Sequence, residues 1–265
     1  MVKRIDITTE LDNTVGDHRL RVHFETPLAT DRVWVEQAFG VVARPFVYES
    51  AGDLEAPVGT GPQKTFTLLT DGRAGVALFN RGIPEIEGRR TAQGSELALT
   101  LLRAVGWLSR ADLRSRYGPA GPELETPEAQ SPGRHRFEYA LATYAGPRDA
   151  GDVGADAHRF AYPPLAALVD PHPGRLPRDA HLVASDNSRI VVSAVSPGRR
   201  PNTCFVRCYN ASDCEEKTVL RFPGSTTLRG VDLLGRPAPI RLRRRGETAH
   251  VRVRPYEIVT LEVRW

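Results

Sequence analysis

Two acidic residues two positions apart, Glu85 and Glu87, are the first candidates for chemistry in this sequence. On an extended strand their side chains would lie on the same side, roughly 7 Å apart. Paired carboxylates at such a separation can cleave a glycosidic bond. Both residues stand among Gly82, Pro84 and Gly88, however, and such a segment is also typical of a solvated turn. A catalytic pair is the weaker of these two hypotheses.

The tripeptide Asp17-His18-Arg19 groups an acid, an imidazole and a guanidinium directly before a strand-like segment. Such a group could hydrogen-bond a sugar hydroxyl or orient a neighbouring domain. It could instead be a buried ion pair that closes the end of the strand, and we favour this structural interpretation.

The histidines and cysteines do not have the spacing of metal ligands. None of the seven histidines has a close partner on a predicted helix, and Cys204, Cys208 and Cys214 match no zinc or redox motif. The sequence therefore predicts three reduced thiols and no metal site. It also lacks a G-x-S-x-G elbow, a phosphate-binding glycine loop and an H-E-x-x-H motif, so the residues alone indicate no self-contained active site.

The elements that position these residues are expected to be short strands. The 265 residues include 23 glycines and 21 prolines, which argues against an all-helical protein. Polar and apolar residues alternate over 19–24, 65–69 and 251–254, as in half-buried strands. Turn signals such as Asp71-Gly72 separate them. The fold class predicted is all-β, built from sandwiches.

Four segments decide the domain organisation. The apolar run 95–108 fits a buried helix or a strand, and we expect a strand followed by a turn. Residues 117–136 and 145–157 are expected to be irregular. Five prolines between Pro163 and Pro177 indicate a linker. We therefore predict a large domain over 1–165, a Pro-rich linker over 166–179 and a small domain over 180–265.

The net charge of +4 raises the question of a nucleic-acid partner, but only three of the 36 basic residues are lysines and the arginines are scattered. The one dense cluster, 241–245, fits a solvated basic strand before a hairpin turn, so we expect no nucleic-acid partner. No apolar run is long enough to span a membrane. The charged N-terminus has no signal-peptide pattern, so we expect a cytoplasmic protein.

Several segments, taken together, resemble the C-terminal region of glycoside hydrolase family 38, the α-mannosidases. They occur in the expected order at 12–24, 75–82, 99–110, 121–130 and 232–261.

The resemblance implies a large β-sandwich, incomplete at its N-terminus, followed by a smaller C-terminal β-sandwich. It also implies an N-terminal catalytic domain, absent from this chain, that binds zinc through a His-x-Asp pair and further residues and that retains the anomeric configuration. No histidine here is followed by x-Asp, so we expect no catalytic residue and no cofactor in this chain. The partners expected are that catalytic domain and mannose-containing glycans. Unpaired strand edges would invite association, so a homo-oligomer stays open.

If the chain lines outer sugar subsites, the expected carbohydrate-binding residues are Arg19, Asn80 and Arg81, because amides and guanidiniums offer several fixed donors. The alternative is that all three are interdomain or turn residues. A second functional class also stays open, a stand-alone carbohydrate-binding or structural β-sandwich without catalysis.

Overall fold

The computed structural model describes residues 3–48, 55–56, 58–146, 150–174 and 177–265. The chain divides into two compact units: unit 1 is Met1–Gln37 with Val42–Tyr162, and unit 2 is Ala38–Val41 with Pro163–Trp265. Between α1 and β11, the described residues 163–174 and 177–183 form no helix or strand. Within the described residues, no helix has the length and apolar character that crossing a membrane requires.

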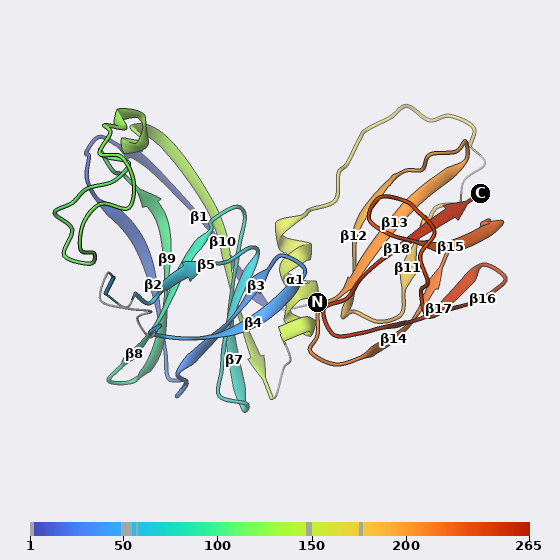
Figure 1. Ribbon diagram of the computed structural model, residues 1–265, viewed down its shortest axis with the longest axis horizontal. Helices are drawn as coiled ribbons and strands as arrows, with labels where there is room; N and C mark the ends of the chain where they lie inside the picture. Colours follow the sequence, from blue (N-terminus) through green and yellow to red (C-terminus); the bar gives the residue numbers. More distant parts are fainter. Residues whose placement is uncertain (1–2, 49–54, 57, 147–149, 175–176) are drawn as a thin grey trace. The chain divides into compact units, whose positions relative to one another are not determined.

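Unit 1 contains two antiparallel sheets (Figure 1). Sheet A has the order β1-β10-β7-β6-β3-β4, with bounds Arg4–Asn13, Gly133–Ala145, Ala74–Asn80, Phe66–Thr70, Arg32–Gln37 and Gly40–Pro45. Sheet B has the order β2-β9-β8-β5, with bounds Arg19–Thr26, Gly94–Arg103, Glu85–Thr91 and Thr60–Pro62. One core joins them, with Val35 and Leu78 from sheet A against Ile86 and Leu99 from sheet B. Alternation along each strand places these side chains between the sheets.

Unit 2 is the smaller sandwich. Sheet C has the order β12-β13-β18-β15, with bounds Ile190–Pro197, Thr203–Asn210, Ile258–Arg264 and Thr227–Val231. Sheet D has the order β11-β14-β17-β16, with bounds Ala184–Ser185, Glu216–Arg221, Thr248–Val253 and Leu242–Arg245. Val206 and Leu261 of sheet C share a core with Leu220 and Val251 of sheet D. The predicted all-β fold, a larger sandwich followed by a smaller one, is confirmed.

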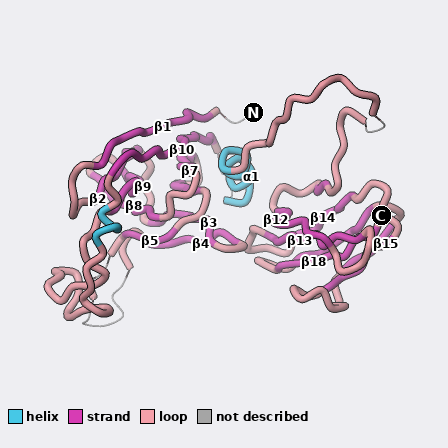
Figure 2. Tube along the Cα trace, turned by 90° about the horizontal axis from the view of Figure 1, so that it is seen from above, coloured by secondary structure: helices cyan, strands magenta, loops and turns pink. Residues whose placement is uncertain are grey.

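One helix was not predicted. α1 spans Ala150–Ala161, where the sequence predicted an irregular segment to residue 157, so that prediction is wrong. Val153, Ala157 and Phe160 are buried at helical spacing. This face packs on β6 and β7 of sheet A, and Figure 2 shows the helix beside β7. The apolar stripe ends at Phe160, beyond the segment taken as irregular.

A long excursion connects β9 to β10. Residues 104–132 contain one short 3-10 helix, Pro127–Gln130, and are otherwise irregular apart from isolated β-bridges, which join Trp107 to Glu125 and Arg116 to Glu55. The predicted irregular segment 117–136 is correct up to Pro132, and its last four residues already belong to β10. This excursion lies at the end of sheet B, beside the start of β2.

Candidate functional site

A groove at one end of sheet B gathers the strongest candidate residues of the chain. It is lined by Asp17, His18 and Arg19, which lead into β2, and by the chain from Arg103 to Arg110 with Leu113, which leads out of β9. The groove holds about 440 Å³. A volume of that size is in the range of small-ligand sites.

Asp17 fixes the wall of this groove through Gln130, which lies 113 residues away. The Asp17 carboxylate accepts hydrogen bonds from the Gln130 side-chain amide at 2.9 Å and from the Gly106 N–H at 3.1 Å. The Asp17 N–H donates to Gln130 Oε1 at 2.8 Å. A Cβ at Gly16 or at Gly106 would lie 2.9 Å from the Gln130 amide. Gln130 and Asp17 therefore join three segments that are distant in the sequence. Gly16 and Gly106 leave the space that the Gln130 side chain fills.

The ion pair predicted within Asp17-His18-Arg19 is wrong, because the hydrogen bonds between Asp17 and Gln130, here called the Asp17–Gln130 clamp, occupy the Asp17 carboxylate. The left-handed backbone of Asp17, with φ of 51°, accompanies a carboxylate bonded to the excursion, not to Arg19. Arg19 instead lies 3.5 Å from Glu85 and keeps 42% of its side chain exposed. His18 Nδ1 is buried and has no hydrogen-bond partner among the described residues. A half-exposed guanidinium beside a groove is available to a ligand.

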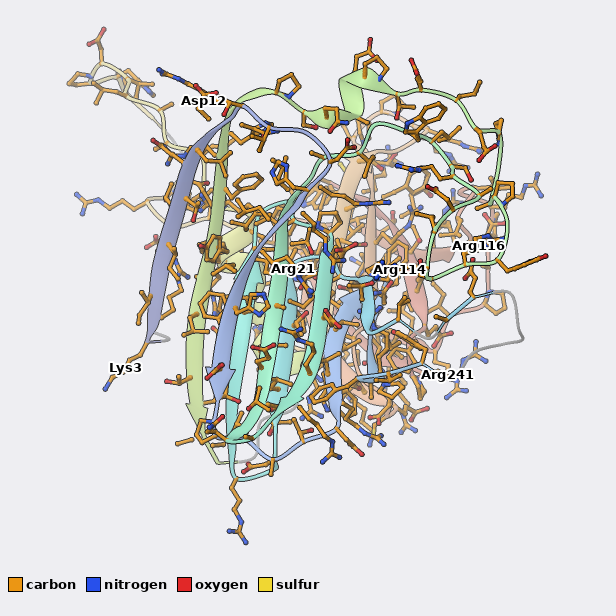
Figure 3. All side chains as sticks on the ribbon, turned by 90° about the vertical axis from the view of Figure 1, so that its left-hand side faces the viewer. Lys3, Asp12, Arg21, Arg114, Arg116 and Arg241 are labelled. Atoms are coloured by element: carbon orange, nitrogen blue, oxygen red, sulfur yellow. The ribbon has the colours of Figure 1, made fainter. Side chains whose placement is uncertain are left out.

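The two carboxylates of β8 lie on one face of sheet B, as predicted, but each is bonded to an arginine. Glu85 accepts a hydrogen bond from the Thr100 hydroxyl at 2.5 Å and pairs with Arg19. Glu87 pairs with Arg21 at 2.5 Å. Figure 3 shows Arg21 on this face of β2. Glu85 and Glu87 lie in strand β8, so the solvated turn expected for them is wrong. Carboxylates paired with arginines in this way still favour a structural role over a catalytic one.

The rim of the groove is apolar and accessible. Trp107, Leu108 and Leu113 are 39%, 61% and 47% exposed, and Tyr117 and Leu124 on the same excursion are 83% and 57% exposed. Single exposed apolar residues are ordinary, but a group of them on one segment indicates a surface for a partner or ligand. Gly106, Trp107 and Gln130 lie in segments that resemble the glycoside hydrolase family 38 C-terminal region. No residue pattern in these segments predicted that they contact one another at the groove.

Asn80 and Arg81 do not lie in the groove with Arg19. Asn80 ends β7 and is fully buried; its Oδ1 accepts a hydrogen bond from the Ile83 N–H at 2.8 Å, and its Nδ2 has no partner among the described residues. Arg81 donates to Glu138 at 2.6 Å and to the Phe160 carbonyl at 3.0 Å, and its guanidinium lies 4.7 Å from the Phe160 ring centroid. These contacts shape a turn and fasten the end of α1, and the sugar-binding role of both residues stays a prediction.

The remaining candidate ligands are dispersed. In the part of the chain that the structure describes, no group of three or more His, Cys, Asp and Glu side chains could hold a metal ion. Cys204, Cys208 and Cys214 are free thiols. Burial raises the pKa of Cys208 to about 12, so this thiol is an inert core residue.

Comparison with known proteins follows the same division of the chain. The family described as "Glycosyl hydrolases family 38 C-terminal domain" matches residues 2–114, and "Glycosyl hydrolases family 38 C-terminal beta sandwich domain" matches residues 189–261. A Halalkalibacterium halodurans protein named "Putative mannosylglycerate hydrolase" is 25% identical over 98% of this chain and 27% of its own length.

Two solved structures from Enterococcus faecalis are similar in fold. An alpha-mannosidase has a TM-score of 0.76 at 27% identity, and a glycosyl hydrolase family 38 protein has a TM-score of 0.76 at 26% identity. Each match covers 98% of this chain but only 27% and 28% of the solved chains, so this chain spans just over a quarter of the length of its relatives. The chain carries the two C-terminal domains of glycosyl hydrolase family 38, at residues 2–114 and 189–261.

Proposed function

We propose that this chain is the non-catalytic β-sandwich part of an α-mannosidase that hydrolyses α-mannosidic bonds with retention of configuration. It supports a catalytic domain of the same family and lines the outer sugar subsites of mannose-containing glycans. The observation that carries the proposal is the groove at the end of sheet B, which the accessible Arg19 and the exposed Trp107 both line. Hydrogen bonds among Asp17, Gly106 and Gln130 fix the wall of this groove.

The chemistry of this groove suits sugar. The Arg19 guanidinium has several donors in a fixed plane, and sugar hydroxyls accept such hydrogen bonds. The exposed edge of Trp107 adds apolar area that a pyranose ring can cover. The exposed apolar residues further along the excursion are where we place the contact with the catalytic domain.

Zinc belongs to the catalytic domain in this proposal. The His, Cys, Asp and Glu residues that the structure describes here do not gather into a metal site, so they do not fit the ion. The three free thiols fit a reducing compartment, and we place the protein in the cytoplasm.

A stand-alone carbohydrate-binding or structural sandwich is the second candidate. The same groove favours it, since Arg19 and Trp107 are accessible without any partner. Sugar binding by the isolated chain that does not change when a catalytic domain is added would support this candidate.

The Arg19→Gln variant is expected to show whether the groove is an outer sugar subsite. With a family 38 catalytic domain present, we expect the variant to raise KM for an α-mannooligosaccharide by about tenfold, because a charge-assisted hydrogen bond is lost. The KM for an aryl α-mannoside, which fills only the cleavage site, should not change. The measurement is steady-state kinetics with both substrates.

Arg32→Gln provides the matched control, since Arg32 is an exposed arginine of unit 1 that contacts only its neighbour Asp31 in the recorded ion pairs. Equal KM changes for the two variants, or for the two substrates with Arg19→Gln, would contradict a subsite at the groove.

A further inference from the structure

The outer face of sheet D carries a concentration of positive charge that the proposed function does not use. Strand alternation places Lys217 of β14 and His250 and Arg252 of β17 on this face, and all three are exposed. Arg243 and Arg245 of β16 are exposed on the same face. Three neighbouring strands therefore present their basic residues together.

Two of these charges lie directly opposite each other, because the register pairs Lys217 with Arg252. Arg243 is paired with His250. Like charges at directly opposite positions destabilise an antiparallel pair. Among the described residues, Lys217, Arg243, Arg245 and Arg252 have no carboxylate within 4.0 Å to form an ion pair with.

Protection of a sheet edge explains only part of this arrangement. Charged residues commonly blunt edge strands, and β16 is the edge of sheet D. β17 is an interior strand, so Arg252 has no edge to protect. β11 pairs only with Leu220 and Arg221 of β14, so Lys217 lies on a part of β14 that is itself an edge. The charge of Arg252 therefore calls for another explanation.

A groove runs over this face. It holds about 700 Å³, and its lining includes Lys217, Arg243 and Arg252 together with one carboxylate, Asp186. Asp186 Oδ1 accepts hydrogen bonds from the Thr218 hydroxyl at 3.0 Å and the Val219 N–H at 2.8 Å, which fixes the carboxylate at the groove. A volume of this size fits a ligand of a few sugar rings.

We infer that this groove binds a short anionic oligosaccharide, one that carries sulfate, phosphate or carboxylate groups. The guanidiniums supply donors for the anionic groups, and Asp186 supplies an acceptor for sugar hydroxyls, which an inorganic polyanion would not use. The described lining has no Phe, Tyr or Trp side chain on which nucleic-acid bases could stack. This inference does not depend on the proposed function.

The test uses a chondroitin sulfate tetrasaccharide, which carries sulfate and carboxylate groups together with free hydroxyls, as the probe and isothermal titration calorimetry on the full 265-residue chain. Maltotetraose, tripolyphosphate and a single-stranded DNA oligonucleotide are the comparison ligands. We expect the chondroitin sulfate tetrasaccharide to bind most tightly. We expect the double variant Arg243→Gln, Arg252→Gln to weaken that binding by about a hundredfold, about tenfold for each guanidinium removed.

Arg264→Gln is the matched control, because Arg264 is an exposed arginine of unit 2 at the end of β18 in sheet C. It should weaken binding by less than about threefold, through net charge alone. The Arg252→Gln variant should keep the wild-type Tm or raise it slightly, because it removes one of the two like charges at Lys217 and Arg252. An unchanged or raised Tm shows that this variant is folded.

Three results would overturn the inference. If the groove double variant and Arg264→Gln weaken binding equally, the loss comes from net charge and not from the groove. If tripolyphosphate binds as tightly as the chondroitin sulfate tetrasaccharide, the sugar contributes nothing to binding and the ligand is not an oligosaccharide. Tighter binding of DNA, lost in the same groove variant, would make the ligand a nucleic acid.

Discussion

The Glu36→Ala variant is expected to lose about 2 to 4 kcal/mol of unfolding free energy in unit 1, because the buried Thr65 N–H and hydroxyl lose their charged acceptor. Glu36 lies in β3 and is 2% exposed. Its carboxylate accepts hydrogen bonds from the Thr65 N–H at 3.0 Å, from the Thr65 hydroxyl and from His158 Nε2 at 2.7 Å, and Lys64 Nζ lies 3.7 Å away. His158 belongs to α1, so the same carboxylate fastens the helix to sheet A.

The measurement is urea unfolding followed by the fluorescence of Trp34, which lies in β3 two positions from Glu36, in a background in which the other two tryptophans, Trp107 and Trp265, are replaced by phenylalanine. Glu10→Ala is the control, because Glu10 is 67% exposed and pairs with Arg136 at the surface. The control should change the free energy by less than about 0.5 kcal/mol. A loss below about 1 kcal/mol for Glu36→Ala would contradict a stabilising role for the contacts of Glu36 with Thr65 and His158.

The pH dependence of stability should carry the same signature. Burial alone would raise the pKa of Glu36, but the hydrogen bonds from His158 and Thr65 and the charge of Lys64 hold that pKa below its ordinary value of 4.5. The folded state then favours the carboxylate, so its contribution is present above pH 4.5 and is lost as the pH falls through the lower folded pKa. The stability difference between the wild type and Glu36→Gln should therefore shrink below pH 4.5. A difference that stays constant would contradict the lowered pKa.

The Gly94→Ala variant is expected to lose about 3 kcal/mol or more, because conformational strain and a steric clash act together. Gly94 begins β9 with a φ of 152°, and a Cβ there would lie 2.4 Å from the carbonyl oxygen of Thr26 and 2.8 Å from the Pro27 carbonyl carbon. These atoms are backbone, so relief requires β2 to move away from β9. Unfolding by urea measures the loss.

Gly72→Ala separates the two causes. Gly72 also has a positive φ, 84°, in the turn between β6 and β7, but a Cβ there would have no heavy atom within 4 Å. Only the conformational cost remains, about 1 kcal/mol. Equal losses at the two glycines would contradict the close approach of β2 to the start of β9.

The strands could be predicted because their signal is local. The alternation over 19–24 predicts β2, observed at Arg19–Thr26, and the apolar run from Ser95 predicts β9, observed at Gly94–Arg103. Nearly all of β9 is buried, which is why its sequence shows no alternation. α1 was missed because its stripe is short and Gly151 and Gly154 interrupt it, while packing on sheet A stabilises it.

The candidate site could be predicted only in part. Arg19 was named from its side-chain chemistry, and it does lie at the groove. The Asp17–Gln130 clamp joins residues 113 positions apart, and no local pattern reports such a contact. Asn80 was also named from its side-chain chemistry, but it is buried at the end of β7, and no local pattern in the sequence reports that burial.

Turnover of an aryl α-mannoside with added zinc tests the central claim most directly. The purified chain is assayed alone and again with a separately expressed family 38 catalytic domain, after circular dichroism has shown both to be folded. We predict no turnover by the chain alone and zinc-dependent turnover in the mixture, above that of the catalytic domain by itself. Turnover by the chain alone that a chelator abolishes would contradict the account, as would a mixture no more active than the catalytic domain by itself.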